Sequence, residues 1–246
     1  MIIISGGFPK SASTLLFYYM EEYLERSGKK NAQKKFLAYN SEGFIHHFGI
    51  LNSTRLFFLN LFYGDVVVKT HAAPNWILKL WINMGIAKAY YSIRDPRDCV
   101  LSALDHGKKA RSKKDKTPSD HAFAPFEKRA DVYPAFHMHF ARYMRWKEFG
   151  KVLFMRYEEL LDSTYGELNN LLHYLGKDED EKNTQAIIEY FGNKKSETRH
   201  FNKGVICRYK DELTKEECEE IEKELPEIFR EMNYPLYKEQ NTWLKE

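Results

Sequence analysis

Residues 2–15 read Ile2-Ile3-Ile4-Ser5-Gly6-Gly7-Phe8-Pro9-Lys10-Ser11-Ala12-Ser13-Thr14-Leu15, and the assignment of a fold class starts from this stretch. The three isoleucines predict a short buried strand, because β-branched side chains favour extended backbone. Two glycines end the strand, and apolar residues then recur at helical spacing from Leu15 to Leu24. A strand, a glycine turn and a helix in this order are typical of a parallel sheet covered by helices.

The same alternation continues along the chain. Short β-type runs predict further strands at 66–68, 90–93 and 152–155, and helical patterns occupy 74–84, the segment from 96 onward, and about 163–175. Thr214 and Glu217 form a capping box before a last helical pattern, inside which Pro226 predicts a break or a kink. We therefore predict an α/β fold: a single domain over residues 1–246 with a central parallel β-sheet flanked by helices.

The composition is that of an ordinary soluble protein, with 43% hydrophobic and 30% charged residues. A net charge of +3 does not favour nucleic acid or a membrane as a partner, and the longest apolar run, at 56–63, is too short to span a bilayer. The three cysteines (Cys99, Cys207 and Cys218) are widely spaced, which indicates a reducing compartment. Because no signal peptide is visible after Met1, we expect a cytoplasmic protein without a membrane span.

Closely spaced histidines occur only as His46-His47 and as His137 with His139. Residues at adjacent or alternate positions do not face each other on a helix. The sequence therefore predicts no metal site.

The loop at 5–15 has the features of an anion cradle. Backbone N–H groups at the start of a helix lack intrahelical acceptors, and the helix dipole favours negative charge there. Lys10 adds a positive charge, and Ser11, Ser13 and Thr14 add hydroxyl donors. In a simpler interpretation the glycines only make a tight turn, and Ser13 or Thr14 caps the helix. The Walker A motif is absent, because the lysine follows proline instead of glycine.

Four segments, in order along the chain, are similar to those of the sulfotransferases that use 3′-phosphoadenosine-5′-phosphosulfate (PAPS). The loop at 8–15 resembles the pattern Y-P-K-S-G-T-T-W. Lys69-Thr70-His71 resembles the K-T-H that follows a strand in the cytosolic members, and Arg156-Tyr157-Glu158-Glu159-Leu160 resembles a Y-E-[DE]-[LM] segment. The segment from Tyr91 to Ser102 resembles the block V-x-R-[ND]-x-[KR]-D-x-x-x-S.

This resemblance implies a P-loop NTPase-like sulfotransferase fold and a metal-independent enzyme. Such an enzyme moves a sulfuryl group from PAPS to a hydroxyl or amine, by in-line transfer with a histidine general base. It releases adenosine 3′,5′-bisphosphate. The expected acceptor is a small molecule, a lipid or a carbohydrate, and no nucleic-acid partner is expected.

The resemblance also assigns catalytic roles. His71 is the general base, since a neutral imidazole accepts a proton near neutral pH. Lys10 neutralises charge that develops on the oxygen between sulfur and phosphorus. Lys69 either assists at the sulfuryl oxygens or pairs with Asp65. The implied catalytic set is His71, Lys10, Lys69 and Ser102.

The donor is expected to contact residues from several segments. Arg94 and Ser102 hold the 3′-phosphate, and the alternative for Arg94 is an ion pair with Asp95 or Asp98. Tyr157 either contacts adenine or belongs to the core. The implied donor-binding residues are Lys10, Ser11, Ala12, Ser13, Thr14, Leu15, Arg94, Ser102, Tyr157, Asn202, Lys203 and Gly204.

The chain departs from the family pattern at three positions. Leu15 replaces a tryptophan that stacks near adenine, so the base is expected to be held by apolar contact. Ala12 replaces glycine, which restricts the loop backbone. Asn202 replaces the leading arginine of the block R-K-G-x-x-G-D-W-K, although Lys203-Gly204 is retained. Two nearby arginines are candidates to replace that contact with the 3′-phosphate: Arg199 and Arg208.

Residues 105–131 show almost no apolar periodicity and are rich in lysine and arginine between Lys108 and Lys116. They predict a mobile basic loop, at the place in the chain where the family has its acceptor lid. The loop is either merely solvated or attracts an anionic or carbohydrate acceptor. The candidates to line the acceptor pocket are His106, His121, Phe123 and Phe126.

Two other functions remain open at this point. A metal-dependent kinase on a related fold would require a lysine after glycine in the first loop and a magnesium-binding acid, and neither is evident. A nucleotide-binding protein without catalytic activity would be consistent with Asn202, whereas Lys10 together with His71 argues against it.

Overall fold

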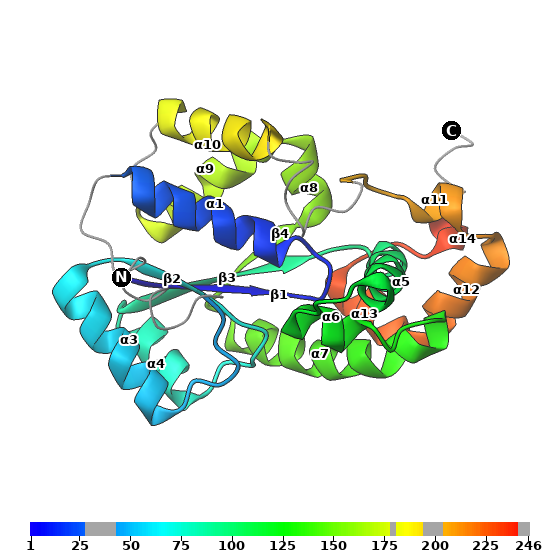
Figure 1. Ribbon diagram of the computed structural model, residues 1–246, viewed down its shortest axis with the longest axis horizontal. Helices are drawn as coiled ribbons and strands as arrows, with labels where there is room; N and C mark the ends of the chain where they lie inside the picture. Colours follow the sequence, from blue (N-terminus) through cyan, green and yellow to red (C-terminus); the bar gives the residue numbers. More distant parts are fainter. Residues whose placement is uncertain (28–42, 178–180, 194–203, 241–246) are drawn as a thin grey trace. The chain divides into compact units, whose positions relative to one another are not determined.

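The computed structural model describes residues 1–27, 43–177, 181–193 and 204–240. The chain forms two compact units (Figure 1). The first contains Met1–Ile93 and Arg142–Lys203, and the second contains Arg94–Ala141 and Gly204–Glu246. All four strands in the described part of the chain lie in the first unit. A single domain over the whole chain remains a prediction.

The first unit is built on a parallel sheet in the order β2-β1-β3-β4. Its strands are β1 (Ile2–Gly7), β2 (Val66–Lys69), β3 (Ala87–Ile93) and β4 (Leu153–Arg156). The predicted α/β fold with a central parallel sheet is confirmed. The register pairs Ser5 with Lys69 and Gly7 with Ser92, so the carboxyl ends of β1, β2 and β3 lie at one edge of the sheet.

Helices cover both faces of this sheet (Figure 1). The first unit contains the end of α7 (Arg129–Phe149) and six further helices: α1 (Ser13–Arg26), α3 (Ile50–Tyr63), α4 (Trp76–Asn83), α8 (Tyr157–Asp162), α9 (Thr164–Leu175) and α10 (Glu181–Asn193). On one face, α1, α9 and α10 form a core with side chains from all four strands, among them Ile3 and Tyr90. On the other face lie α3 and α4.

The start of α4 differs from the prediction. The side chain of Asn75 accepts a hydrogen bond from the N–H of Leu78 at 3.0 Å, so Asn75 caps the helix and Trp76 is its first residue. Pro74 therefore precedes the helix instead of opening it.

The second unit is helical. Its helices are α5 (Pro96–Ser112), α6 (Pro118–Phe123), the first part of α7 (Arg129–Phe149), α11 (Tyr209–Glu212), α12 (Lys215–Glu224), α13 (Pro226–Met232) and α14 (Tyr237–Gln240). The capping box of Thr214 and Glu217 begins α12, and Pro226 begins α13, so the predicted break is confirmed. No helix among the described residues is long and apolar enough to cross a membrane.

The segment at 105–131 is more regular than predicted. The end of α5, the whole of α6 and the start of α7 occupy most of it. The guanidinium of Arg111 donates hydrogen bonds to the carbonyls of Ala124 and Phe126, both at 2.8 Å, and holds the turn after α6. The expectation of a loop without regular structure is wrong. Its charged side chains hide the helical period in the sequence, and tertiary hydrogen bonds fix the turn.

Candidate functional site

The loop between β1 and α1 turns tightly against β3. A Cβ atom on Gly6 would lie 2.7 Å from the ring of Tyr91, and one on Gly7 would overlap the side chain of Ser92. Only glycine leaves room for these side chains of β3. Both glycines lie within β1 and neither has a positive φ, so it is packing against β3 that requires them, and not the turn.

Ser11 anchors the loop. Its hydroxyl lies 2.6 Å from the carbonyl oxygen of Phe8, 2.9 Å from that of Ser92 and 2.8 Å from the Ser92 hydroxyl. The side chain is fully buried. This differs from the predicted role of the Ser11 hydroxyl as a donor to a ligand, because the sequence does not show that Ser92 lies opposite it.

The loop backbone has two left-handed residues before α1 begins. Lys10 and Ala12 both have a φ of 66°, which is in the left-handed region. Left-handed residues in such turns direct successive N–H groups toward a common centre, which makes an anion-binding concavity. The N–H groups of Ser13, Thr14 and Leu15 follow in the first turn of α1, which has no capping side chain. These backbone features favour the predicted anion cradle.

The charges along the two relevant segments favour an anion. Residues 2–20 and 66–93 contain no aspartate or glutamate. They contain Lys10 in the loop and Lys69 at the end of β2. A negatively charged ligand at this edge of the sheet would meet positive side chains and the amino end of α1.

His71 lies against the same loop. Its Nδ1 is 2.9 Å from the carbonyl oxygen of Gly7, and since a carbonyl only accepts, Nδ1 carries the hydrogen. In the neutral ring Nε2 is then the acceptor. The backbone at this point is held by α7, because Arg142 donates to the His71 carbonyl at 3.4 Å and the Trp146 indole donates to that of Ala72 at 3.0 Å.

Lys69 reaches the loop from the end of β2. Its amine donates a hydrogen bond to the hydroxyl of Thr14. Asp65 instead binds the amino group of Met1 at 2.5 Å and the amine of Lys177. The alternative in which Lys69 pairs with Asp65 is therefore wrong, and the structure brings Lys69 together with the predicted cradle.

Phe44 is a neighbour of these residues that the sequence did not reveal. Its segment forms a β-bridge with Lys69. Its ring centroid lies 5.4 Å from that of His71 and 4.4 Å from that of His46, and the Lys69 amine lies 6.0 Å from the ring centre. No motif marks Phe44, because its position depends on a bridge between segments that are distant in the chain.

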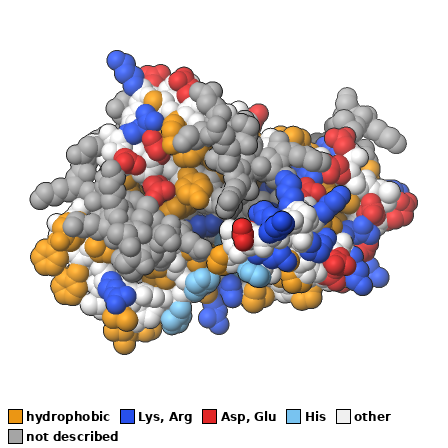
Figure 2. Space-filling model, viewed as in Figure 1, with side chains coloured by type: hydrophobic (Ala, Val, Ile, Leu, Met, Phe, Trp, Pro, Cys, Tyr) orange, Lys and Arg blue, Asp and Glu red, His pale blue; other side chains and the backbone are white. Residues whose placement is uncertain are grey.

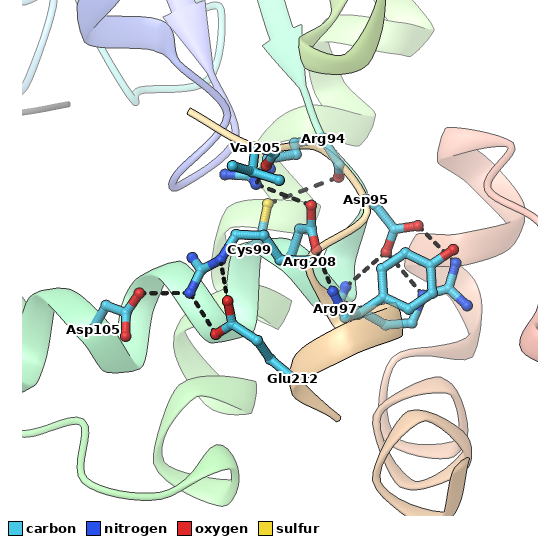
Figure 3. Close-up of polar contacts among 10 residues, drawn as sticks. Arg94, Asp95, Arg97, Cys99, Asp105, Val205, Arg208 and Glu212 are labelled. Carbon is cyan, nitrogen blue, oxygen red and sulfur yellow. Dashed lines mark hydrogen bonds and ion pairs between the residues drawn. The ribbon is translucent and has the colours of Figure 1, made fainter. Parts of the chain in front are cut away.

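In the second unit, Arg94 forms a buried cluster (Figure 3). Its Nη2 donates to a carboxylate oxygen of Asp98 and to the carbonyl of Val205, both at 2.9 Å. The alternative role predicted for Arg94 was an ion pair with Asp95 or Asp98. The structure shows the pair with Asp98, and this pair is buried. Ser102, also buried, is one turn after Asp98 on α5 and so lies on the same face of the helix. The bond to Val205 also brings the chain next to Gly204 close to Arg94.

Arg97 has a structural role that the motif did not indicate. Its guanidinium binds Asp95 at 2.6 Å and Glu222 at 2.8 Å, and it lies 4.0 Å from the ring centre of Tyr209. Burial would lower the pKa of Arg97, but its hydrogen bonds to Asp95 raise that pKa overall, so the group stays charged. Burial raises the pKa of Asp95 and of Glu222, with the bonds to Arg97 acting in the opposite direction.

Arg208 also pairs with carboxylates. Its Nη2 is 2.8 Å from both Asp105 and Glu212, and the side chain is buried (Figure 3). These contacts do not favour Arg208 as the residue that replaces the arginine of the family pattern at position 202, where this chain has Asn202. Three residues named in the prediction lie outside the described ones: Arg199, Asn202 and Lys203.

Two predicted contacts with adenine lie on core elements. Tyr157 is the first residue of α8 and is buried, which favours the core alternative for it. Leu15 is half-buried on α1 and packs against the core.

The residues predicted to line an acceptor pocket are brought together in part. The rings of His106 and Phe123 stack with centroids 4.5 Å apart, and Phe126 contacts Phe123 edge-on at 5.6 Å. His106 Nε2 also lies 3.1 Å from Asp120. His121 is exposed on α6. Whether this cluster faces an acceptor stays a prediction.

Within the described ranges, no group of three or more histidine, cysteine, aspartate or glutamate side chains is arranged to hold a metal ion. Cys99, Cys207 and Cys218 are free thiols. The groups gathered at the loop are amines, an imidazole, hydroxyls and backbone N–H groups.

The family model of the sulfotransferase domain matches residues 64–232, more than half of the chain. The fold is similar to that of mouse sulfotransferase SULT7A1 complexed with PAP, with a TM-score of 0.60 and 18% identity over 93% of this chain and 84% of that one.

Retinol dehydratase in a complex with retinol and PAP is similar at a TM-score of 0.57 and 15% identity, over 93% of this chain and 81% of that one. Its complex with androsterone and PAP is similar at a TM-score of 0.56 and 16% identity, over 93% of this chain and 80% of that one. Comparison with curated protein sequences gave no match. At these identities the solved structures show a common fold, and the family match goes further: this chain belongs to the sulfotransferase domain family.

Proposed function

We propose that this sulfotransferase uses PAPS as its donor and transfers the sulfuryl group to a hydroxyl or amine, with His71 as the general base. The observation that carries the proposal is the hydrogen bond of 2.9 Å from His71 Nδ1 to the Gly7 carbonyl. It joins an imidazole to an anion cradle at the carboxyl edge of a parallel sheet, where α/β folds bind their ligands. The presence of PAP in solved structures of this fold supports the donor.

The loop after β1 would hold the 5′-phosphosulfate. Its left-handed turns and the amino end of α1 supply N–H donors, and Lys10 supplies a positive charge. Thr14, with Lys69 bonded to its hydroxyl, borders the same cradle. The residues present therefore fit a dianionic group. Lys10 would offset the charge that develops on the oxygen leaving sulfur.

His71 would act through Nε2. Because Nδ1 is committed to Gly7, Nε2 is the atom that accepts the proton of the acceptor hydroxyl as its oxygen bonds to sulfur. The bond between sulfur and the bridging oxygen breaks, and adenosine 3′,5′-bisphosphate leaves with that electron pair. The hydrogen bonds of Arg142 and Trp146 to the backbone at His71 and Ala72 would keep the imidazole in place.

Arg94 and Ser102 would bind the 3′-phosphate. The buried carboxylate of Asp98 fixes the direction of the guanidinium and lies one turn before Ser102. A preoriented guanidinium binds a phosphate with less loss of side-chain entropy. The segment at Gly204, next to the carbonyl of Val205 that Arg94 binds, would complete this part of the site.

The acceptor is expected to be a small molecule, a lipid or a carbohydrate. Retinol and androsterone, which occupy the solved structures of retinol dehydratase, are small apolar molecules. The aromatic cluster of His106, Phe123 and Phe126 would contact such an acceptor. The cytoplasm remains the expected compartment.

Calorimetric titration without magnesium tests the donor. Adenosine 3′,5′-bisphosphate should bind clearly more tightly than 5′-AMP or ATP, because of the three only it carries the 3′-phosphate that Arg94 and Ser102 are proposed to bind. Preference for ATP, or no binding of any of the three, would overturn the proposal. Transfer from radiolabelled PAPS to a panel of alcohols, phenols and amines then separates an active enzyme from a protein that only binds the nucleotide.

A further inference from the structure

The surface of α3 and α4 carries large apolar side chains on the solvent side. Among the residues that the structure describes, fourteen large hydrophobic side chains are exposed, and nine of them fall on these two helices and the residue that ends α4. We call them the α3–α4 surface: Ile50, Leu51, Phe58, Leu61, Phe62, Tyr63, Trp76, Leu80 and Met84. Exposed apolar groups concentrated in this way mark an interaction site.

The pattern on each helix is a stripe. On α3, Leu51, Phe58 and Phe62 recur at the spacing of one helix face, and the rings of Phe58 and Phe62 stack with centroids 6.0 Å apart. A shallow groove runs along this face. On α4, Trp76 and Leu80 are one turn apart, and the two helices meet where the rings of Phe57 and Trp81 lie 6.4 Å apart.

The orientation of α3 is the reverse of that expected for a helix that only covers a sheet. Its buried residues are Ser53 and Leu56, whereas Phe62 is 64% exposed and Leu61 is 61% exposed. A covering helix normally turns its largest apolar side chains toward the core. Burial of the remaining stripe therefore requires a contact beyond those that the described residues of this unit make.

The charges carried by α3 and α4 themselves are of one sign. Between residues 43 and 93 the only acidic residue is Asp65, and it is bound to the amino group of Met1 and to Lys177. Arg55 lines the groove of α3, and Lys79 lies on α4. Figure 2 shows hydrophobic side chains gathered over these two helices, with basic and histidine side chains beside them.

From this combination we infer that the α3–α4 surface docks on the surface of a membrane that contains anionic lipids. An interfacial helix buries an apolar face at the level of the headgroups, and cationic side chains add attraction to anionic lipid. Trp76 opens α4 and Tyr63 ends α3, and tryptophan and tyrosine favour this interfacial zone. The absence of acidic side chains along both helices is the feature that favours a lipid surface over a protein partner.

The same surface begins close to the proposed active site. Phe44 lies beside His71, and α3 starts six residues later along the chain. The side chain of Asn75 donates to the carbonyl of Phe48 at 2.6 Å and ties the starts of α3 and α4 together. This arrangement favours a membrane amphiphile as the acceptor. That last step, unlike the docking itself, rests on the proposed function.

Sedimentation with vesicles tests the inference. The protein should bind vesicles of phosphatidylcholine mixed with phosphatidylserine and bind vesicles of phosphatidylcholine alone more weakly, and salt should weaken the binding. Phe58→Glu combined with Phe62→Glu should lower the partition by about tenfold or more, since two half-exposed rings are lost from the contact. The control is Tyr165→Glu on α9, an exposed aromatic residue elsewhere in the unit, which should bind as the wild type does.

Equal binding by the double variant, or no binding of the wild type to mixed vesicles, would overturn the inference. A concentration-dependent self-association that the double variant abolishes, without vesicle binding, would assign the surface to a second copy of the chain instead. All variants should bind adenosine 3′,5′-bisphosphate equally in calorimetry. A failure of that binding in every variant would count against the proposed donor and leave the vesicle result intact.

Discussion

The two units of this chain use their basic side chains in different ways. In the first unit, Lys10 and Lys69 stand at a glycine loop, in segments that contain no acidic residue. In the second, the three arginines of the buried clusters are each bonded to carboxylates: Arg94 to Asp98, Arg97 to Asp95 and Glu222, and Arg208 to Asp105 and Glu212.

This difference separates basic residues placed at a candidate anion site from basic residues that are paired with buried carboxylates and hold the fold. A buried cation with matched carboxylates is already satisfied, so removing it leaves uncompensated charge. A cation beside a helix terminus, with no acid in its own segment, instead adds to the field that attracts an anion. Substitution of these basic residues is thus expected to lower stability in the second unit and activity in the first.

The largest effect is expected at Arg97. Arg97→Ala leaves the carboxylates of Asp95 and Glu222 buried without their guanidinium, and breaking a buried ion pair in this way costs about 3–5 kcal/mol. Urea unfolding should show this loss. Arg230→Ala is the matched control, because Arg230 is exposed and its pair with Glu231 is worth at most about 1 kcal/mol. Similar losses in the two variants would contradict the structural role of Arg97.

His71 tests the expectation that a substitution at the loop of the first unit lowers activity and not stability. His71→Ala should lower turnover by about two orders of magnitude, because the acceptor then loses its base, while bisphosphate affinity and unfolding free energy stay near those of the wild type. Initial rates with labelled PAPS and calorimetry measure the two quantities. His173→Ala, at an exposed histidine on α9, serves as the control. Turnover close to that of the wild type in His71→Ala would remove His71 as the base.

The sequence predicted the parts of this molecule that depend on local pattern. The three isoleucines of β1, the capping box at Thr214 and the break at Pro226 all lie where predicted. Each depends on neighbours within a few residues. The positions of Lys69 and His71 at the end of β2 were also accessible, since the motif follows directly on a strand.

Contacts between distant segments could not be predicted in the same way. The bond of Ser11 to Ser92 joins residues 81 positions apart, and the approach of Phe44 to His71 depends on an isolated β-bridge. The same is true of Arg208, whose partner Asp105 lies 103 positions away. Local pattern gives the elements and their ends, and the partner of each polar side chain is decided by which elements the fold brings together.

Arg94 combines the structural role and the ligand-binding role. It is paired with Asp98, and the sequence motif predicts that it binds the 3′-phosphate. Arg94→Ala should weaken adenosine 3′,5′-bisphosphate binding by about tenfold, through loss of a charged hydrogen bond, and leave 5′-AMP binding nearly unchanged. Calorimetry with both nucleotides gives the ratio. Arg208→Ala should lower stability without changing this ratio. Equal losses for both nucleotides in Arg94→Ala would assign Arg94 to the fold, and a changed ratio in Arg208→Ala would restore Arg208 as a phosphate contact.

The smallest effect concerns the backbone of the loop itself. Ala12 has a φ of 66° and a ψ of 18°, a left-handed conformation that is strained for any residue with a Cβ atom. Ala12→Gly should therefore raise the free energy of unfolding by about 0.5–1 kcal/mol, the relief of strain exceeding the greater entropy of glycine in the unfolded chain. Ala141→Gly, on an exposed position inside α7, should have the opposite sign, about 1 kcal/mol of destabilisation, because glycine is unfavourable within a helix. Urea unfolding of both variants compares the same chemical change in two backbone conformations. Destabilisation in both would mean that the loop does not hold Ala12 in the left-handed region, and the concave arrangement of N–H groups proposed for the phosphosulfate would lose its basis.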